Sequence, residues 1–206
     1  MLSGLVQRHK TAIRRADLSR PIRLAMEHGF LNHTTTLFDY GCGHGDDIGR
    51  LIQQGIDASG WDPIHFAENP RQPADVVNLG YVVNVIENPA ERASVLRDAW
   101  SFAQKLLIVS ARLSIEAKNG ASSNPYADGY VTSRGTFQKF YDQRELCDWI
   151  NEVLDLQSIA VAPGVFYVFR DNDLRQSFAA SRYRRTAAIP RQKYSHLIFE
   201  QYRDLF

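Results

Sequence analysis

The sequence predicts an α/β fold of the doubly wound kind, in which a mostly parallel sheet carries helices on both faces. Three observations predict it. In Leu37-Phe-Asp-Tyr-Gly-Cys-Gly-His-Gly45, a short apolar run is followed by glycines at alternate positions. A second short run ends at Asp62, about 20 residues past the glycine loop. Leu106-Leu-Ile-Val109 is fully apolar, as strands buried on both faces of a parallel sheet require.

The glycine loop joins an expected strand, Leu37–Tyr40, to an expected helix that begins at Asp46-Asp47. Glycines at this junction let the backbone turn tightly and approach a ligand closely. Strand, glycine loop and helix together form the nucleotide-binding unit of doubly wound folds. No G-x-x-x-x-G-K-[ST] motif is present, which argues against a phosphate-cradling ATPase or GTPase.

The first half of the chain contains further helix and strand signals. We expect a short basic helix over 7–17, then a helix capped by Ser19, with Pro21 in its first turn and Gly29 at its end. The segment 63–73 holds three prolines and is expected to be a loop, so either one strand or helix of the usual doubly wound pattern is missing here or the loop is unusually economical. A strand follows over 74–79, and an apolar helix is expected over 81–86.

The second half starts with a strong helix signal, in which Asn88 is the cap and Pro89 the first helical residue. The polar stretch 111–135 is expected to be a long loop that acts as a lid, mobile without ligand and ordered with it. A helix is expected over 142–153. Two strands, 156–161 and 165–169, then form an antiparallel hairpin at the edge of the sheet, and a helical extension follows over 171–206.

Composition limits the class of protein. The chain has 206 residues, 44% hydrophobic and 23% charged, which suits one globular domain with an appendage. Net charge is only +1, but residues 1–30 hold six Lys/Arg against two acids, and 171–206 hold seven against four. Two basic ends on an acidic middle indicate either an anionic partner or solvated helix faces.

The cysteines and histidines point to no disulfide framework or metal site. Only Cys42 and Cys147 occur, so a reducing, cytoplasmic compartment is expected. The six histidines have no zinc-like spacing, and we expect no metal. No apolar run approaches the length of a membrane span, so we expect no membrane partner, and the oligomeric state is left open.

The D-Y-G-C-G-x-G-D form of the glycine loop resembles the first motif of class I S-adenosylmethionine (SAM)-dependent methyltransferases. The segment from Asp75 to Pro89 is similar to the fourth strand of that superfamily and its following turn. The resemblance implies a Rossmann-like class I methyltransferase fold, with SAM as cofactor and S-adenosylhomocysteine as product.

Four pieces resemble, more narrowly, the DNA phosphorothioation-associated methyltransferase family of bacteria. They are His9–Arg14 with Leu18–Pro21, the glycine loop, Asn78–Glu87 and Thr132–Tyr141. Members of that family look longer than this chain, so we expect either a fragment or a stand-alone module. The expected divisions are a basic helical prelude (1–30), a SAM-binding domain (31–170) and the C-terminal extension (171–206).

The expected cofactor site follows the two motifs. Asp62 can accept hydrogen bonds from ribose hydroxyls, although Asp62-Pro63 also favours a simple turn. The resemblance implies that Asp39 helps to hold the amino group of the methionine part, the alternative being a cap on the loop amides. The expected cofactor-binding residues are Asp39, Tyr40, Gly41, Cys42, Gly43, Asp46, Asp62, Pro63, Asn78 and Leu79.

The catalytic and substrate residues are less well specified. Asn78-Leu-Gly-Tyr81 invites comparison with the N/D-P-P-Y box of amino-group methyltransferases, but both prolines are absent. The catalytic candidates are Tyr81, Asn84 and Tyr141. The substrate candidates are Lys10, Arg14, Tyr126, Tyr130 and Arg134. The basic ones also suit a solvated helix, and the aromatic ones also suit packing.

The order of functional expectations follows from these signals. The first is a SAM-dependent methyltransferase that acts on a small molecule. The second is a nucleic-acid methyltransferase linked to phosphorothioation-type DNA modification or defence. The third is a non-catalytic SAM-binding module.

Overall fold

The computed structural model describes residues 6–117 and 123–187. The chain divides into two compact units, Met1–Asp171 and Asn172–Phe206. The described part of the second unit is one helix, α5 (Asn172–Ala187), as expected for the start of the extension. The rest of that predicted extension, 188–206, lies outside the described residues.

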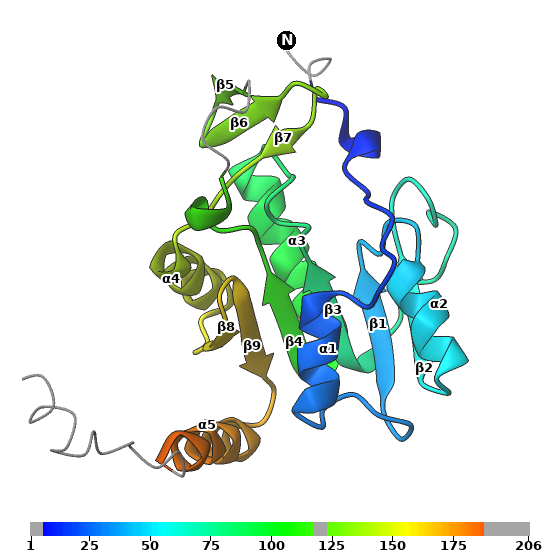
Figure 1. The fold of residues 1–206 in the computed structure, drawn as a ribbon, viewed down its shortest axis with the longest axis vertical. Helices are drawn as coiled ribbons and strands as arrows, with labels where there is room; N and C mark the ends of the chain where they lie inside the picture. Colours follow the sequence, from blue (N-terminus) through cyan, green and yellow to red (C-terminus); the bar gives the residue numbers. More distant parts are fainter. Residues whose placement is uncertain (1–5, 118–122, 188–206) are drawn as a thin grey trace, which may run out of the picture. The chain divides into compact units, whose positions relative to one another are not determined.

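A six-stranded sheet forms the centre of the first unit (Figure 1), in the order β2-β1-β3-β4-β9-β8. The first four are parallel, whereas β9 pairs antiparallel with both of its neighbours. The strands are β1 (Thr36–Tyr40), β2 (Asp57–Trp61), β3 (Ala74–Gly80), β4 (Ala103–Ser110), β8 (Ile159–Ala162) and β9 (Val165–Phe169). The doubly wound fold with a C-terminal antiparallel hairpin is therefore confirmed.

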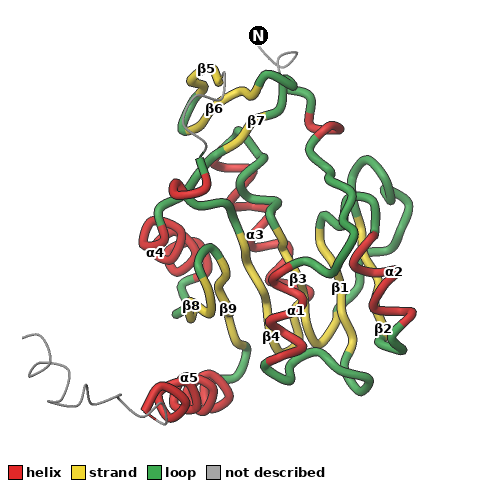
Figure 2. Tube along the Cα trace, in the orientation of Figure 1, coloured by secondary structure: helices red, strands yellow, loops and turns green. Residues whose placement is uncertain are grey.

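Helices cover both faces of this sheet, α1 lying in front of it and α3 behind it in Figure 1, with α4 packed against α3. The helices are α1 (Arg20–Glu27), α2 (Asp46–Gln53), α3 (Pro89–Phe102) and α4 (Gln143–Leu154). The expected start of α3 is confirmed, since the Asn88 side chain accepts hydrogen bonds from the N–H groups of Ala90 and Glu91. Figure 2 shows that the connection from β2 to β3 is loop, as expected for residues 63–73.

The core lies where apolar strand residues meet these helices. Phe38, Val77, Leu107 and Phe166 are fully buried on four neighbouring strands. Burial of such side chains stabilises the fold by roughly 1.5–3 kcal/mol each. None of the helices in the described part of the chain has the length and apolar character needed to span a membrane.

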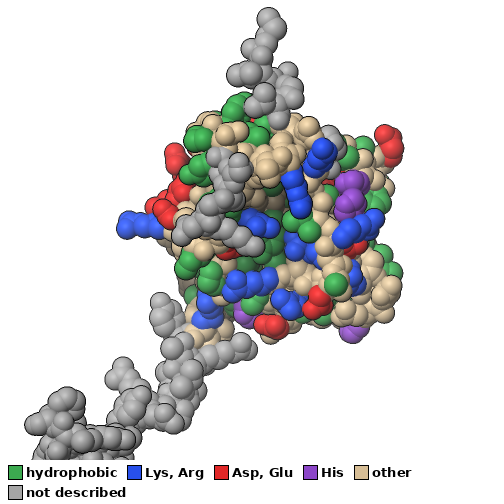
Figure 3. Space-filling model, turned by 45° about the horizontal axis from the view of Figure 1, so that its top comes forward, with side chains coloured by type: hydrophobic (Ala, Val, Ile, Leu, Met, Phe, Trp, Pro, Cys, Tyr) green, Lys and Arg blue, Asp and Glu red, His purple; other side chains and the backbone are tan. Residues whose placement is uncertain are grey.

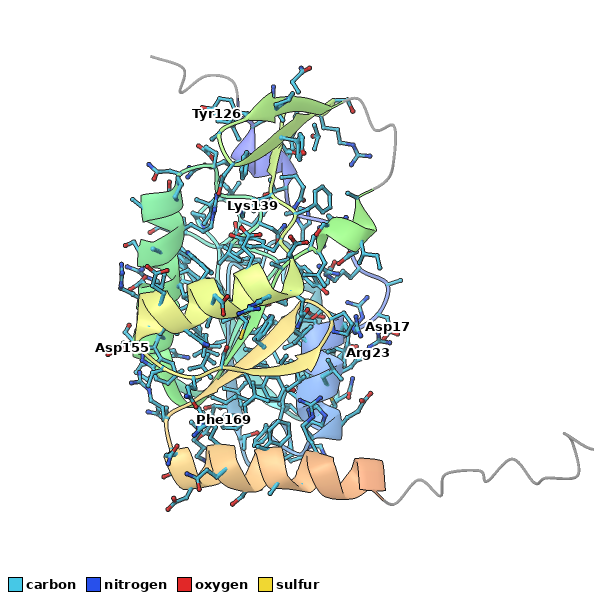
Figure 4. The ribbon with its side chains drawn as sticks, turned by 90° about the vertical axis from the view of Figure 1, so that its left-hand side faces the viewer. Asp17, Arg23, Tyr126, Lys139, Asp155 and Phe169 are labelled. Carbon is cyan, nitrogen blue, oxygen red and sulfur yellow. The ribbon has the colours of Figure 1, made fainter. Side chains whose placement is uncertain are left out.

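The stretch 111–135 was wrongly expected to be one long loop. Within it, β5 (Ser123–Tyr126) and β6 (Gly129–Thr132) pair across the two-residue turn Ala127-Asp128, and β7 (Phe137–Gln138) completes a small antiparallel sheet. Tyr126 lies on this small sheet, away from the main one (Figure 4).

An ion-pair network with buried cations and exposed acids, which local composition cannot reveal, anchors the small sheet. Arg92, 3% exposed, donates to Asp128 at 2.8 and 3.0 Å, and Lys139 lies 3.1 Å from Asp128 and 2.7 Å from Glu145 of α4. Hydrogen bonds from Arg92 and Lys139 hold the pKa of the Asp128 carboxyl at about 2, against the opposing effect of burial.

Two helix expectations were also wrong. Over 7–17 the structure has only a short 3₁₀ turn, Arg8–Lys10, because the Arg15 N–H donates to the Asp46 carboxylate rather than to a helical carbonyl. Over 81–86 the chain turns instead of forming a helix. Tyr81 there has a positive φ of 61°, and its N–H donates to Ser110 O of the neighbouring strand end.

Candidate active site

A cavity of about 600 Å³ lies at the carboxyl edge of the parallel strands. This is the edge at which open α/β sheets bind their ligands, and the volume is that of a typical small-molecule site. The prelude, the glycine loop, and the residues that end β2 and β3 all contribute to its walls. In Figure 3 the top of the molecule is turned toward the viewer. Several Lys and Arg side chains lie on the face seen in that view.

The glycine loop leaves no room for a side chain at its first glycine. At Gly41, φ is +81° and a Cβ would lie 2.5 Å from a methyl carbon of Val82. The N–H groups of Gly41 and Cys42 both donate to Trp61 O, at 2.8 and 3.1 Å, which ties the loop to the end of β2. The loop is therefore a rigid backbone wall of the cavity.

Asp62 follows β2 and lines the cavity beside the glycine loop. Its Oδ2 accepts a hydrogen bond from Gly43 N–H at 3.1 Å. Its Oδ1 accepts from the N–H groups of Ile64 and His65, at 2.9 and 3.0 Å, so Asp62 does start a turn. A carboxylate has about four acceptor positions, and these three bonds leave capacity for a ligand hydroxyl.

Asp39 and Asp47 place two more carboxylates in the same part of the cavity. Asp39 is 5% exposed and accepts a hydrogen bond from Asn78 Nδ2 at 2.8 Å. Burial, together with repulsion from Asp47, raises the pKa of Asp39 to about 7. Asp47, also buried, accepts from Ser19 N–H at 2.8 Å. Buried acids of this kind favour a cationic ligand group.

Cys42 contributes a thiol to this wall, and its surroundings disfavour the thiolate. Burial and the carboxylates of Asp39 and Asp62 raise its pKa to about 12, so it stays a neutral thiol at physiological pH.

The other end of the cavity is formed by Tyr81, Asn84, Arg112, Glu116 and Gln138. Burial raises the pKa of the Tyr81 phenol, which therefore remains protonated. The Arg15 guanidinium lies 5.4 Å from the centroid of the Tyr81 ring. Asn84 is 1% exposed, and its main-chain carbonyl oxygen accepts a hydrogen bond from Gln138 Nε2 at 3.3 Å.

The prelude closes one side of the cavity and is tied down at both ends. Arg8 donates to Glu87 and Glu91 at 2.6–3.1 Å, and these bonds raise its pKa above the ordinary value. Ser19 is fixed by Asp47, as described above, and between these ties Thr11, Ala12, Ile13 and Arg15 line the cavity.

The cavity brings together ten of the residues expected from the sequence: Asp39, Tyr40, Gly41, Cys42, Gly43, Asp62, Pro63, Asn78, Tyr81 and Asn84. Other expected residues lie elsewhere. Leu79 is fully buried in the core, and Asp46 faces Arg14 and the Arg15 N–H. Tyr141 is buried with its ring 4.7 Å from Lys139 Nζ, which Figure 4 places near α4. The side chains outside the cavity also include Lys10, Arg14, Tyr126, Tyr130 and Arg134.

Several cavity residues had not been among the expected site residues. Arg112 lies two residues past the end of β4, and Gln138 belongs to β7, whose strand character was not anticipated. Asp47 lines the cavity instead of its neighbour Asp46, and His65 lies in the turn after Asp62 with its ring 4.2 Å from that of His44. The described residues contain no cluster of three or more potential metal-ligating side chains.

Comparison with solved structures identifies the fold. The sugar N-methyltransferase KedS8 from Streptoalloteichus sp. matches with a TM-score of 0.53 and 13% identity, covering 73% of this chain and 85% of that one. DesVI from Streptomyces venezuelae matches with a TM-score of 0.51 and 11% identity, covering 71% and 90%. A chain of the Pnkp1/Rnl/Hen1 RNA repair complex matches with a TM-score of 0.50 and 12% identity, covering 73% and 41%.

The chain thus has the Rossmann-like fold found in methyltransferases. No protein-family model and no curated protein matches the sequence. At these identities the likeness establishes the fold alone, and the resemblance to the phosphorothioation-associated family stays a prediction.

Proposed function

We propose that this protein is a SAM-dependent methyltransferase that acts on a small molecule. The observation that carries the proposal is the cavity of about 600 Å³, bounded by the glycine loop and Asp62 at the carboxyl edge of a methyltransferase-like sheet. KedS8, with the same fold, is a sugar N-methyltransferase, which supports the choice of a small-molecule acceptor.

The residues around the glycine loop fit SAM. Asp62 has acceptor capacity for ribose hydroxyls, and the positive-φ glycines leave their side of the cavity free of side chains. Pro63 and the 53%-exposed Ile64 offer an apolar surface for a purine ring. The buried carboxylates of Asp39 and Asp47 would stabilise cationic groups. Cys42 and Cys147 are both unpaired, which is consistent with a reducing cytoplasm.

Bound SAM supplies a methyl group already activated by the sulfonium, so the protein mainly has to orient the acceptor and exclude water. Tyr81, Asn84 and Gln138, at the other end of the cavity, would position the acceptor. The prelude would limit the entry of water, because Arg8 and Ser19 fix it on both sides of the cavity.

Calorimetry with S-adenosylhomocysteine tests cofactor binding. We expect saturable binding, weakened at least tenfold in Asp62→Ala because a charged acceptor is lost. The matched control is Asp57→Ala, since Asp57 is exposed at the opposite end of the same strand. Failure of the folded protein to bind at millimolar ligand, or equal effects of the two substitutions, would contradict the proposal.

Labelled methyl transfer from SAM into fractionated lysate tests the acceptor class. We expect label in the small-molecule fraction, unaffected by nuclease treatment. The nucleic-acid alternative predicts nuclease-sensitive label and salt-sensitive binding. The small-molecule choice is also supported by the ion pairs of two exposed prelude cations, Arg14 with Asp46 and Arg23 with Asp17, which reduce the positive charge offered to phosphates.

A further inference from the structure

The charges along the cavity are divided between its two ends. Asp39, Asp47 and Asp62 lie together around the glycine loop, whereas Arg15, Arg112 and Glu116 contribute to the part lined by Tyr81. Arg15 also acts electrostatically on Asp39. A ligand that fills both ends meets three carboxylates at the first end, and two guanidinium groups with the carboxylate of Glu116 at the second.

The two guanidinium groups lack carboxylate partners. Within 6–117 and 123–187, neither Arg15 nor Arg112 has an acidic side chain within salt-bridge distance of 4.0 Å. Arg8, in contrast, lies at the same cavity and pairs with Glu87 and Glu91.

The acids that line this end, Glu91 and Glu116, form no salt bridge with Arg15 or Arg112 in the described part of the chain. Both oxygens of Glu91 accept from Arg8, and Glu116 Oε1 accepts from Leu113 N–H. Half-buried guanidinium groups without a counter-charge are costly, because burial removes part of their hydration. An anion in this place would offset that cost.

Tyr81 stands between these cations in a strained conformation. A φ of 61° is rare for a bulky aromatic residue, and such strain gathers where function needs a side chain in one position. Burial raises the pKa of the Tyr81 phenol, Glu116 adds to this effect, and the positive charges of Arg15, Arg20 and Arg112 oppose it. The phenol therefore keeps its proton and can donate a hydrogen bond to an anion.

We propose that the Tyr81 end of the cavity is an anion subsite, in which Arg112, Arg15 and the Tyr81 hydroxyl bind the carboxylate or phosphate of a small acidic methyl acceptor. Guanidinium groups bind both anions in bidentate fashion. The role as acceptor site rests on the proposed function, whereas anion binding itself does not. A cavity of about 600 Å³ fits a small acid rather than a polymer.

The test measures binding of benzoate, phenyl phosphate and uncharged benzamide to the full chain by calorimetry, with and without saturating S-adenosylhomocysteine. We expect at least one of the two acids to bind with millimolar or tighter affinity and at least tenfold more tightly than benzamide. The tighter of the two acids identifies the preferred anion. A twelve-residue oligothymidylate is the polymer probe, and we expect it to bind more weakly than the preferred acid.

Arg112→Ala should weaken binding of the preferred acid about ten- to a hundredfold, the usual effect of losing a charged hydrogen bond. The affinity for S-adenosylhomocysteine should stay within twofold. Arg144→Ala is the control, since Arg144 is 93% exposed on α4 and pairs only with Asp148 among the described residues. If Arg112→Ala does not fold, Arg15→Ala is the second variant and should also weaken binding of the acid.

Equal binding of benzoate, phenyl phosphate and benzamide would overturn the inference, as would unchanged binding of the acid in a folded Arg112→Ala variant. Oligothymidylate binding at micromolar concentration without binding of either acid would also overturn it. Acid binding that depends on Arg112, in a protein that does not bind S-adenosylhomocysteine, would support the anion subsite and contradict only the proposed function.

Discussion

Asn78 donates a hydrogen bond from Nδ2 to Asp39 Oδ1 over 2.8 Å, and the two residues are register partners on the parallel strands β3 and β1. Since a carboxylate only accepts, the Asn78 amide must turn its NH₂ group toward Asp39. Asn78 Oδ1 is then left buried without a hydrogen-bond partner in the described structure. The pair thus holds a proton-binding acid and a free acceptor at the cavity wall.

Asp39 makes stability depend on pH. Its folded pKa of about 7 lies above the unfolded value of ~3.9, so the folded state binds the proton more tightly. That stabilisation is complete below about pH 4 and is lost as pH rises through 7, on the order of 4 kcal/mol. Asp39→Asn cannot ionise, so its stability relative to wild type should increase between pH 4 and pH 8.

Urea unfolding at several pH values measures this difference. Asp57→Asn is the control, because Asp57 is exposed at the start of β2, and its stability relative to wild type should not change with pH in this way. Parallel pH–stability curves for wild type and Asp39→Asn would show that Asp39 ionises normally.

Tyr81 allows a test of backbone strain. At an ordinary position alanine is more stable than glycine, by roughly 0.5–1 kcal/mol in regular structure. At the φ of 61° observed for Tyr81 the order should reverse, because a Cβ is disfavoured there by roughly 1–2 kcal/mol. We therefore expect Tyr81→Gly to be more stable than Tyr81→Ala, while both lose methyl transfer. Thermal unfolding of the pair checks the order, and alanine being the more stable would argue against strain.

Substitution by alanine should change the stability of the protein in opposite directions at Gly41 and at Gly49. Gly41→Ala places a Cβ 2.5 Å from Val82 at positive φ, so it should destabilise the protein by more than 1 kcal/mol and weaken cofactor binding. Gly49 lies within α2 with no atom within 4 Å of an added Cβ, so Gly49→Ala should stabilise by up to about 1 kcal/mol. Denaturant titration of both variants decides, and similar effects would mean that the glycine loop is not a tight wall.

Local signals made the central part of the site predictable. The alternating glycines, the acid after β2 and the Asn88 cap each act within a few residues of their own position. The remaining side chains of the site are placed by the geometry of the strand or helix that carries them, which no local motif reveals. Alternation along β3 puts Asn78 at the cavity and Leu79 in the core, and the start of α2 puts Asp47 rather than Asp46 inward. The choice between Asp46 and Asp47 could not be read from the sequence, because the two neighbours are identical in type.

The small sheet changes what is expected of the predicted lid. Because Arg92 anchors Asp128 beside the β5–β6 turn, we expect the paired amides of this hairpin to be protected from hydrogen exchange without ligand. Arg92→Met should weaken that protection, since Asp128 would lose both hydrogen bonds from Arg92 and keep only its ion pair with Lys139. Arg97→Met, on the exposed side of the same helix, is the control. Fast exchange in the free protein that slows with S-adenosylhomocysteine would favour the lid instead.

Arg8 should control how fast ligands leave. Its guanidinium joins the prelude to Glu87 and Glu91 through four hydrogen bonds, whereas Arg14 makes one exposed pair with Asp46 at 3.1 Å. Surface pairs of the second kind contribute roughly 0–1 kcal/mol, and a network with bidentate geometry contributes more. Arg8→Ala should therefore raise the dissociation rate of S-adenosylhomocysteine about three- to tenfold, since ~1 kcal/mol corresponds to roughly fivefold. Arg14→Ala should change it less than twofold. Stopped-flow displacement of bound ligand measures both rates, and equal rates in the two variants would show that the prelude does not retain the cofactor.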